Sequence, residues 1–385
     1  MKPFYLSAVF LFLLNFSFAQ SLQTYTTNVN GENRSYLVYT PAVYQPGQPV
    51  PLVFNFHGYG SNMNEQMVYG NFKPIADTAN FIIVCPDGSN VSGQNGWNTG
   101  TTIAAFQKEI NFVNKMLDEL QINYSVNPSR IYSTGMSNGG FMSYGLACFM
   151  SDKIAAIASV TGGMTGLFKF SCHPSSPTPV MQIHGTADAL VNYNGSPGVL
   201  SVNELIDFWT TINGTKKVPV HTLKPDINTS DNSTAEWFVY ADSLHTPNTV
   251  ELFKINNGGH TWPGALFPVS GNTNMDINAS IEIWRFFSQY NLHSVLAANS
   301  VNEKVPGLEI FPNPATEEIT IKRTGYSEKM TLQLIDVSGR TVKKARLENE
   351  YTMLSVSSLP KGIYIYTAYS DESYPVILTG KLSIE

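Results

Sequence analysis

The stretch RIYSTGMSNGGF, residues 130–141, decides how this chain folds. Its first five residues form an apolar, strand-like run, and residues 141–149 form a helix-like run. A tight turn between such a strand and helix presents its central residue, Ser137, with the hydroxyl exposed, and the flanking glycines permit the close backbone approach that the turn needs. The pattern predicts a nucleophilic serine; a serine that serves only the turn is the alternative.

Two further polar residues follow strand-like runs downstream. Residues 180–183 lead to Asp188, and residues 250–255 lead to His260. The order Ser, Asp, His along the chain is that of α/β-hydrolases. Because open α/β sheets place their sites at the carboxyl ends of strands, we expect these side chains to meet at one edge.

The rest of residues 20–293 alternates between strand-like and helix-like runs. This alternation predicts an α/β fold, with a mostly parallel sheet covered by helices on both faces. Other expected strands are residues 34–39, 51–56 and 81–84, and the expected helices are residues 103–120, 200–212 and 277–290.

The residue types predict acyl-transfer chemistry. A serine hydroxyl is a weak nucleophile without an adjacent base, for which we choose His260. Asp188 would fix the tautomer of that histidine and stabilise its cation. The oxyanion would be bound by the backbone N–H of Asn138 and by that of Tyr59, in the loop after residues 57–58.

Other residues compete for these roles. Only His260 both follows a strand and sits between glycines and the TWPG loop at residues 261–264. Asp188 is favoured because it lies in a turn at a strand end. The competing histidines and aspartates are His221, His245, His293, Asp207, Asp226, Asp231 and Asp242. His57 is expected to shape the oxyanion loop, and His184 to serve a turn or the core.

Three aromatic residues lie on loops at the same predicted face. Trp97 and Trp262 are expected to line the substrate subsite, and Tyr59 lies in the oxyanion loop. Ordinary packing is the alternative for each of them.

The first 19 residues predict a secretory signal peptide. A positive start, an apolar run and a small-x-small site precede Gln20, and the run is short for a membrane anchor, which is the alternative. No membrane span is expected in the mature chain.

A formal charge of −6 argues against nucleic acid or an anionic membrane as partner. No metal-ligand spacing and no nucleotide motif occurs, so no metal or other cofactor is expected.

The cysteines and the end of the chain complete the domain plan. Cys148 and Cys172 could pair in an oxidising compartment, although the odd count of 3 leaves the pairing open, and Cys85 fits a buried strand.

All five tryptophans precede residue 294. We expect a linker at residues 294–306 and, because apolar residues alternate between glycine turns, a small β-sandwich at residues 307–385.

These motifs together resemble the secreted polyhydroxybutyrate depolymerase and feruloyl esterase group, which overlaps carbohydrate esterase family one. The resemblance covers about residues 30–290 and implies a lidless α/β-hydrolase that cleaves carboxylic esters. It also implies the triad Ser137, Asp188 and His260 and a disulfide between Cys148 and Cys172. The matching motifs are RSYLVY (34–39), HGYG (57–60), PDG (86–88), GWN (96–98), GMSNGG (135–140), HGTAD (184–188) and GHTWPG (259–264).

The tail resembles the C-terminal sorting domain of type IX secretion. The matching segments are LEIFPNPA (308–315), LQLIDVSGR (332–340) and LPKGIY (359–364). The resemblance implies the type IX machinery as a partner and a secreted or surface-attached protein. A substrate-binding module is the alternative for the tail.

The leading hypothesis is a secreted serine esterase acting on feruloyl or acetyl esters of plant polysaccharide. A poly(3-hydroxybutyrate) depolymerase is the second, since the acyl pocket is built from loops that the motifs do not describe. A peptidase with the same triad and a non-catalytic binding protein are further alternatives.

Overall fold

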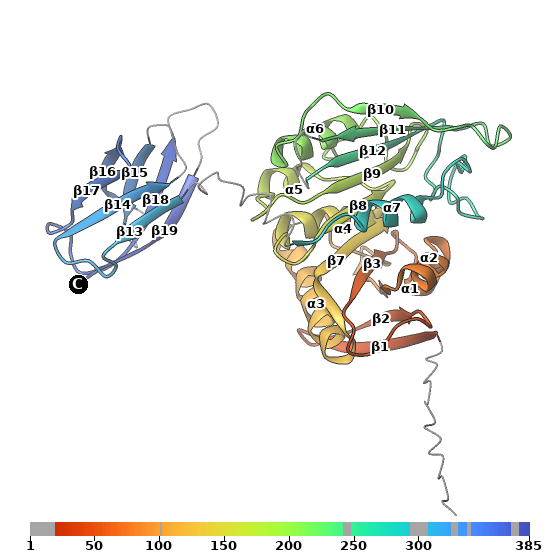
Figure 1. The fold of residues 1–385 in the computed structure, drawn as a ribbon, viewed down its shortest axis with the longest axis horizontal. Helices are drawn as coiled ribbons and strands as arrows, with labels where there is room; N and C mark the ends of the chain where they lie inside the picture. The colour runs from red at the N-terminus through yellow and green to blue at the C-terminus, as the bar shows by residue number, and fades with distance from the viewer. Residues whose placement is uncertain are drawn as a thin grey trace, which may run out of the picture. The chain divides into compact units, whose positions relative to one another are not determined.

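The computed structural model describes residues 20–100, 102–241, 248–292, 307–324, 330–336, 340–370 and 377–385. The predicted signal peptide and linker lie outside these residues, as do Asp242, His245 and His293. The chain divides into two compact units, residues 1–298 and 299–385, which are described separately (Figure 1).

The first unit is built on a ten-stranded sheet of order β1-β2-β4-β3-β7-β8-β9-β12-β11-β10. Its six central strands pair in parallel: β4 (Ile82–Pro86), β3 (Val50–Phe56), β7 (Val126–Met136), β8 (Ala156–Val160), β9 (Val180–Gly185) and β12 (Val250–Asn256). The edge strands pair antiparallel: β1 (Ser21–Val29), β2 (Glu32–Thr40), β11 (Thr234–Tyr240) and β10 (Val220–Leu223).

Helices cover both faces of this sheet, and each face has its own buried apolar cluster. One cluster includes side chains from α3 (Ile103–Asn123), α4 (Asn138–Phe149), α5 (Gly166–Ser171) and α6 (Val202–Ile212). The other includes side chains from α1 (Met63–Tyr69), α2 (Lys73–Ala79) and α7 (Ala279–Phe287). The predicted α/β-hydrolase architecture is confirmed.

Capping side chains explain where the helices begin. The predicted helix at 200–212 starts at Val202 because Ser201 and Glu204 form a capping box. The predicted helix at 277–290 starts at Ala279, since the side chain of Asn278 accepts the N–H of Ile281. The short helices α1 and α2 and the hairpin of β5 (Ser89–Val91) and β6 (Gln94–Gly96) were not predicted.

The second unit consists of two antiparallel sheets over a common core. One sheet has the order β13-β14-β17 and the other the order β16-β15-β18-β19. Buried apolar residues from both sheets, such as Ile321 and Leu332, pack into one cluster, which confirms the predicted small sandwich. The strands are β13 (Gly307–Phe311), β14 (Glu318–Thr324), β15 (Met330–Ile335), β16 (Thr341–Leu347), β17 (Tyr351–Ser355), β18 (Gly362–Ser370) and β19 (Ile377–Ile384).

Cys148, at the end of α4, and Cys172, just after α5, form a disulfide. Cys85 is a free, buried thiol on β4. None of the helices in the described ranges is long and apolar enough to cross a bilayer.

Candidate active site

Ser137 stands in a strained turn between β7 and α4. Its φ of 53° and ψ of −118° are unusual for a residue with a side chain. The N–H of Ser137 donates to the carbonyl of Val160 at 2.8 Å, which ties the turn to the end of β8. Such strain persists only where the surroundings enforce it, and it clusters at functional sites.

The glycines on either side allow this turn to pack against the end of β3. A Cβ on Gly139 would lie 2.1 Å from the carbonyl oxygen of Phe56, and one on Gly135 would lie 2.6 Å from the same atom. Neither position has room for a side chain. The strand-turn-helix geometry expected from the sequence is therefore present, with Ser137 partly exposed at its tip.

Asp188 and His260 are in direct contact. The Nδ1 atom of His260 lies 2.8 Å from Oδ2 of Asp188, and both side chains are buried. The other oxygen, Oδ1, accepts the N–H groups of Leu190 and Val191, each at 2.9 Å. Burial acts to raise the pKa of Asp188, but hydrogen bonds from His184 and His260 outweigh it and hold the pKa well below its ordinary value.

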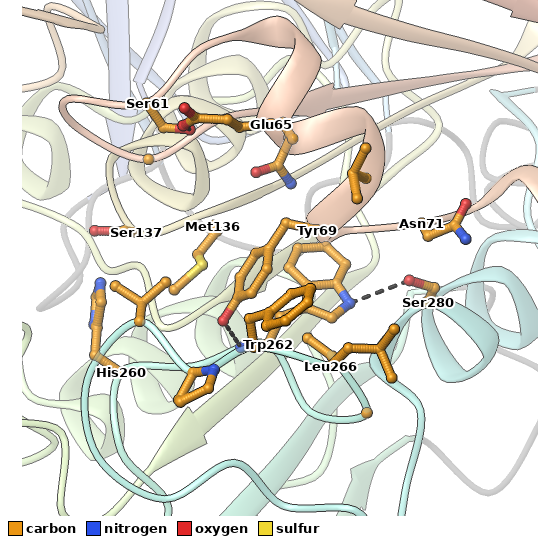
Figure 2. A pocket seen from close by; sticks show the side chains of 18 of the residues that line it. Ser61, Glu65, Tyr69, Asn71, Met136, Ser137, His260, Trp262, Leu266 and Ser280 are labelled. Atoms are coloured by element: carbon orange, nitrogen blue, oxygen red, sulfur yellow. Dashed lines mark hydrogen bonds between the residues drawn. The ribbon is translucent and has the colours of Figure 1, made fainter.

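The loop after β12 carries His260 back toward the turn of Ser137. The N–H of His260 donates to the carbonyl of Ser270 at 2.7 Å, and the N–H of Gly259 donates to that of Asn272 at 2.9 Å. Ser137 and His260 line the same cavity and appear beside each other at one side of it (Figure 2). Since Nδ1 of His260 is engaged by Asp188, Nε2 is the nitrogen left for the cavity.

His57 fixes the loop that precedes the turn. The N–H of Gly88 donates to Nε2 of His57 at 2.9 Å, so Nδ1 carries the proton and donates to the carbonyl of Gly58 at 2.7 Å. Burial lowers the pKa of His57, which keeps the ring neutral. The Gly58 carbonyl is thereby turned toward His57, and the N–H of Tyr59, in the same peptide plane, points the opposite way.

This loop lies against the serine turn. A Cβ on Gly58 would be 3.5 Å from the Cβ of Ser137. The N–H groups of Tyr59 and Asn138, the two predicted oxyanion donors, make no hydrogen bond within the described part of the chain. Two such donors beside one serine can bind a developing oxyanion.

Trp97, which we expected to contact substrate, is not among the residues that line the cavity. Its side chain is 1% exposed, and its Nε1–H donates to the carbonyl of His57 at 2.9 Å. Its ring also packs edge-on against Phe56, with centroids 5.0 Å apart. Trp97 therefore supports the loop that begins at His57.

The cavity beside Ser137 measures about 1090 Å³. Tyr69 and Trp262 form the middle of its wall, where Trp262 is only 1% exposed, and Leu266 and Ser280 lie on the side away from Ser137 (Figure 2). The hydroxyl of Tyr69 accepts the backbone N–H of Trp262 at 3.1 Å, and the indole N–H donates to Ser280 at 3.1 Å. Tyr69 belongs to α1 and has no motif around it, so sequence reasoning did not find it.

One wall of the cavity is apolar and open to solvent. Leu266, Phe267 and Val269 lie in the loop between His260 and Ser270 and are 84%, 69% and 58% exposed. Ile281 of α7 adds a further exposed apolar side chain. Polar side chains of Ser61 and Glu65 line another part (Figure 2). The cavity thus offers apolar surface well beyond Ser137 and His260.

The competing residues in the described ranges lie elsewhere. His221 is 43% exposed and pairs with Glu236, and Asp207 pairs with Lys217. Oδ1 of Asp231 accepts the backbone N–H of Ser233, and Asp226 is exposed. None of these lines the cavity. In the same ranges no group of three His, Cys, Asp or Glu residues could hold a metal ion.

The fold and this arrangement define an α/β-hydrolase. Residues 40–230 match the family model described as Phospholipase/Carboxylesterase, and residues 309–383 match that of the secretion system C-terminal sorting domain. The main unit belongs to this carboxylesterase family, and the tail is a sorting domain, as the resemblances predicted. The tail also confirms the expectation of a secreted or cell-surface protein.

Curated relatives carry related names. "Feruloyl esterase D" of Neurospora crassa is 29% identical over 183 residues, which are 44% of this chain and 58% of that protein. "Bifunctional acetylxylan esterase/xylanase" of Neocallimastix patriciarum is 29% identical over 171 residues, 44% of this chain and 24% of that protein. The chain thus spans less than two thirds of either relative.

A solved structure supports the fold. Acetyl xylan esterase from Aspergillus awamori superposes with a TM-score of 0.50 at 15% identity, covering 70% of this chain and 99% of the other. At this identity the likeness supports the fold alone.

Proposed function

We propose that this protein is a secreted serine carboxylesterase that hydrolyses esters linked to plant polysaccharide. One observation carries the proposal: a strained serine and a histidine bonded to a buried aspartate line one cavity. Ser137, His260 and Asp188 would act as nucleophile, base and orienting acid. The names of the relatives, among them a feruloyl esterase and an acetylxylan esterase, support the substrate class.

The reaction would proceed through an acyl-enzyme. Oγ of Ser137 attacks the ester carbonyl while Nε2 of His260 takes its proton, and the tetrahedral oxyanion is bound by the N–H groups of Tyr59 and Asn138. The carbon–oxygen bond to the alcohol then breaks as His260 returns the proton to the leaving alkoxide. Water, activated by the same histidine, cleaves the acyl-enzyme and releases the acid.

The cavity favours a feruloyl group over acetyl. A cavity of about 1090 Å³ with an exposed apolar wall far exceeds what an acetyl group would fill. Trp262 and Tyr69 line it together with two further aromatic residues, Tyr59 and Phe267, and we propose that Trp262 and Tyr69 contact the acyl group. An apolar wall open to solvent would also suit a polyester chain, so a poly(3-hydroxybutyrate) depolymerase is the second candidate.

The test is hydrolysis of methyl ferulate, acetylated xylan and a poly(3-hydroxybutyrate) film by the mature chain, beside its Ser137→Ala variant. Release of ferulate with an intact film supports the proposal, and clearing of the film supports the second candidate. Equal turnover by Ser137→Ala and wild type on every substrate would rule out the mechanism.

A further inference from the structure

A chain of buried side chains leads from helix α4 to Asp188. The hydroxyl of Tyr144 donates to Oε1 of Gln182 at 2.8 Å, and Nε2 of Gln182 lies 2.7 Å from Nδ1 of His184. Nε2 of His184 in turn lies 2.8 Å from the carbonyl oxygen of Val191 and 3.4 Å from Oδ2 of Asp188. Tyr144, Gln182 and His184 are each at most 1% exposed.

These contacts fix the tautomer of His184. Because Oε1 of Gln182 accepts from Tyr144, the amide nitrogen must face the other way, where it donates to the carbonyl of Gly162 at 2.8 Å and to Nδ1 of His184. An accepting Nδ1 leaves the proton of the neutral ring on Nε2. That N–H donates to Val191 and faces the carboxylate of Asp188.

His184 thereby closes the turn that carries Asp188. The carbonyl of Val191 receives the histidine proton, while the N–H of Val191 donates to Oδ1 of Asp188 at 2.9 Å. With Oδ1 held by the turn, Oδ2 is the oxygen directed at His260. The direction of that oxygen thus depends on the shape of the turn, which His184 holds from strand β9.

We propose that His184 is a positioning residue: held in its Nε2–H form by Gln182, it fixes the Asp188 turn so that Oδ2 aligns with His260. This inference rests on the proposed esterase function. A histidine that only fills space in the core would need neither a fixed tautomer nor two acceptors on one nitrogen.

The test uses a matched pair, His184→Gln and His184→Asn. The amide nitrogen of glutamine reaches the place of Nε2 and can donate to Val191, whereas that of asparagine reaches only the place of Nδ1. We expect His184→Asn to lower kcat on p-nitrophenyl acetate about tenfold, the worth of one such hydrogen bond. His184→Gln should stay within about threefold of wild type.

The pH profile separates positioning from packing. In His184→Asn, a misaligned Asp188 stabilises the His260 cation less, so the acid limb of kcat/KM should move to lower pH. The other titratable groups near these histidines are Tyr193, edge-on to His184, and Tyr144. Burial raises the pKa of Tyr193 to about 12 and that of Tyr144 well above its ordinary value, so neither titrates there.

A second variant and a spectroscopic measurement guard against poor folding. Gln182→Met removes the donor to Nδ1 at nearly constant volume without placing a carboxylate beside His184, and it should lower kcat in the same direction as His184→Asn. The proton NMR signal of the His260 Nδ1–H should persist in His184→Gln and shift or broaden in His184→Asn. The exposed His173, replaced as His173→Gln, is the control for a histidine substitution outside the network.

The proposal is overturned if folded His184→Asn keeps the wild-type kcat, acid limb and NMR signal, or if both His184 variants lose activity equally. A wild-type protein that hydrolyses no ester would instead refute the esterase function, which keeps the two failures distinct.

Discussion

The side chain of Asn138 grips the backbone of Trp97 at both of its polar groups. Oδ1 accepts the N–H of Trp97 at 2.7 Å, and Nδ2 donates to its carbonyl at 3.2 Å and to the hydroxyl of Thr99 at 2.8 Å. The residue after the serine thus joins the turn of Ser137 to the segment that supports His57 and the loop carrying Tyr59. The backbone N–H of Asn138 is one proposed oxyanion donor, and its side chain holds the segment that supports the loop of the other donor.

Replacing Asn138 with alanine keeps its backbone N–H but removes the side-chain hydrogen bonds to Trp97 and Thr99. We expect kcat on p-nitrophenyl acetate to fall about tenfold, because the loop carrying Tyr59, the proposed second oxyanion donor, loses a support made of three hydrogen bonds. Steady-state kinetics and a thermal melt of the variant measure both effects. Asn123→Ala, at the exposed end of α3, is the control, and unchanged kinetics for Asn138→Ala would contradict the supporting role.

Asp188 should make stability depend on acid pH. Its folded pKa is depressed, so the unfolded chain binds the proton more readily and stability rises with pH through the unfolded value of about 3.9. The contribution is present above that value and is lost as pH falls below it. Urea unfolding of wild type and Asp188→Asn between pH 3 and about pH 7 should therefore show a gap that narrows toward low pH. A gap that is constant over this range would show that the carboxylate is not specially stabilised.

The parts of the site that the sequence could predict are those with local patterns. Ser137, Asp188 and His260 each follow the end of a strand, and the parallel sheet brings such ends together. Trp97 and Trp262 have similar loop settings and both are buried, and sequence alone could not tell that one of the two, Trp262, borders the cavity. That difference depends on long-range partners of the indole groups, the carbonyl of His57 for Trp97 and Ser280 for Trp262.

Cavity walls were the least predictable part. Tyr69 lies on α1, a seven-residue helix too short for a clear apolar period, and it reaches Trp262 across 193 positions of sequence. The shape of the 264–270 loop, with its exposed apolar side chains, likewise depends on backbone pairing such as that of His260 with Ser270. The secondary-structure propensities of local sequence do not predict such long-range contacts.

The disulfide should stabilise the protein without serving the chemistry. Cys148 and Cys172 are 24 residues apart, and closing a loop of this length is worth about 3 kcal/mol in the chain-entropy model. The double variant Cys148→Ala with Cys172→Ala should lose that much in the free energy of unfolding, measured with urea. Its kcat on p-nitrophenyl acetate should match wild type at a temperature where both are folded. A drop in kcat with little loss of stability would show that the bond holds the site itself.

Substitutions of Trp97 and Trp262 should separate a residue that supports the loop at His57 from one that borders the cavity. Trp97→Phe removes the donor to the buried carbonyl of His57 and should cost about 1–3 kcal/mol of stability, with KM for methyl ferulate unchanged. Trp262→Phe also loses a hydrogen bond, to Ser280, but it changes the cavity surface and should raise KM for methyl ferulate more than for p-nitrophenyl acetate. Parallel melts and kinetics of the two variants check this. If Trp97→Phe raised KM selectively for ferulate while Trp262→Phe did not, the substrate would lie on the other side of the oxyanion loop from the cavity described here.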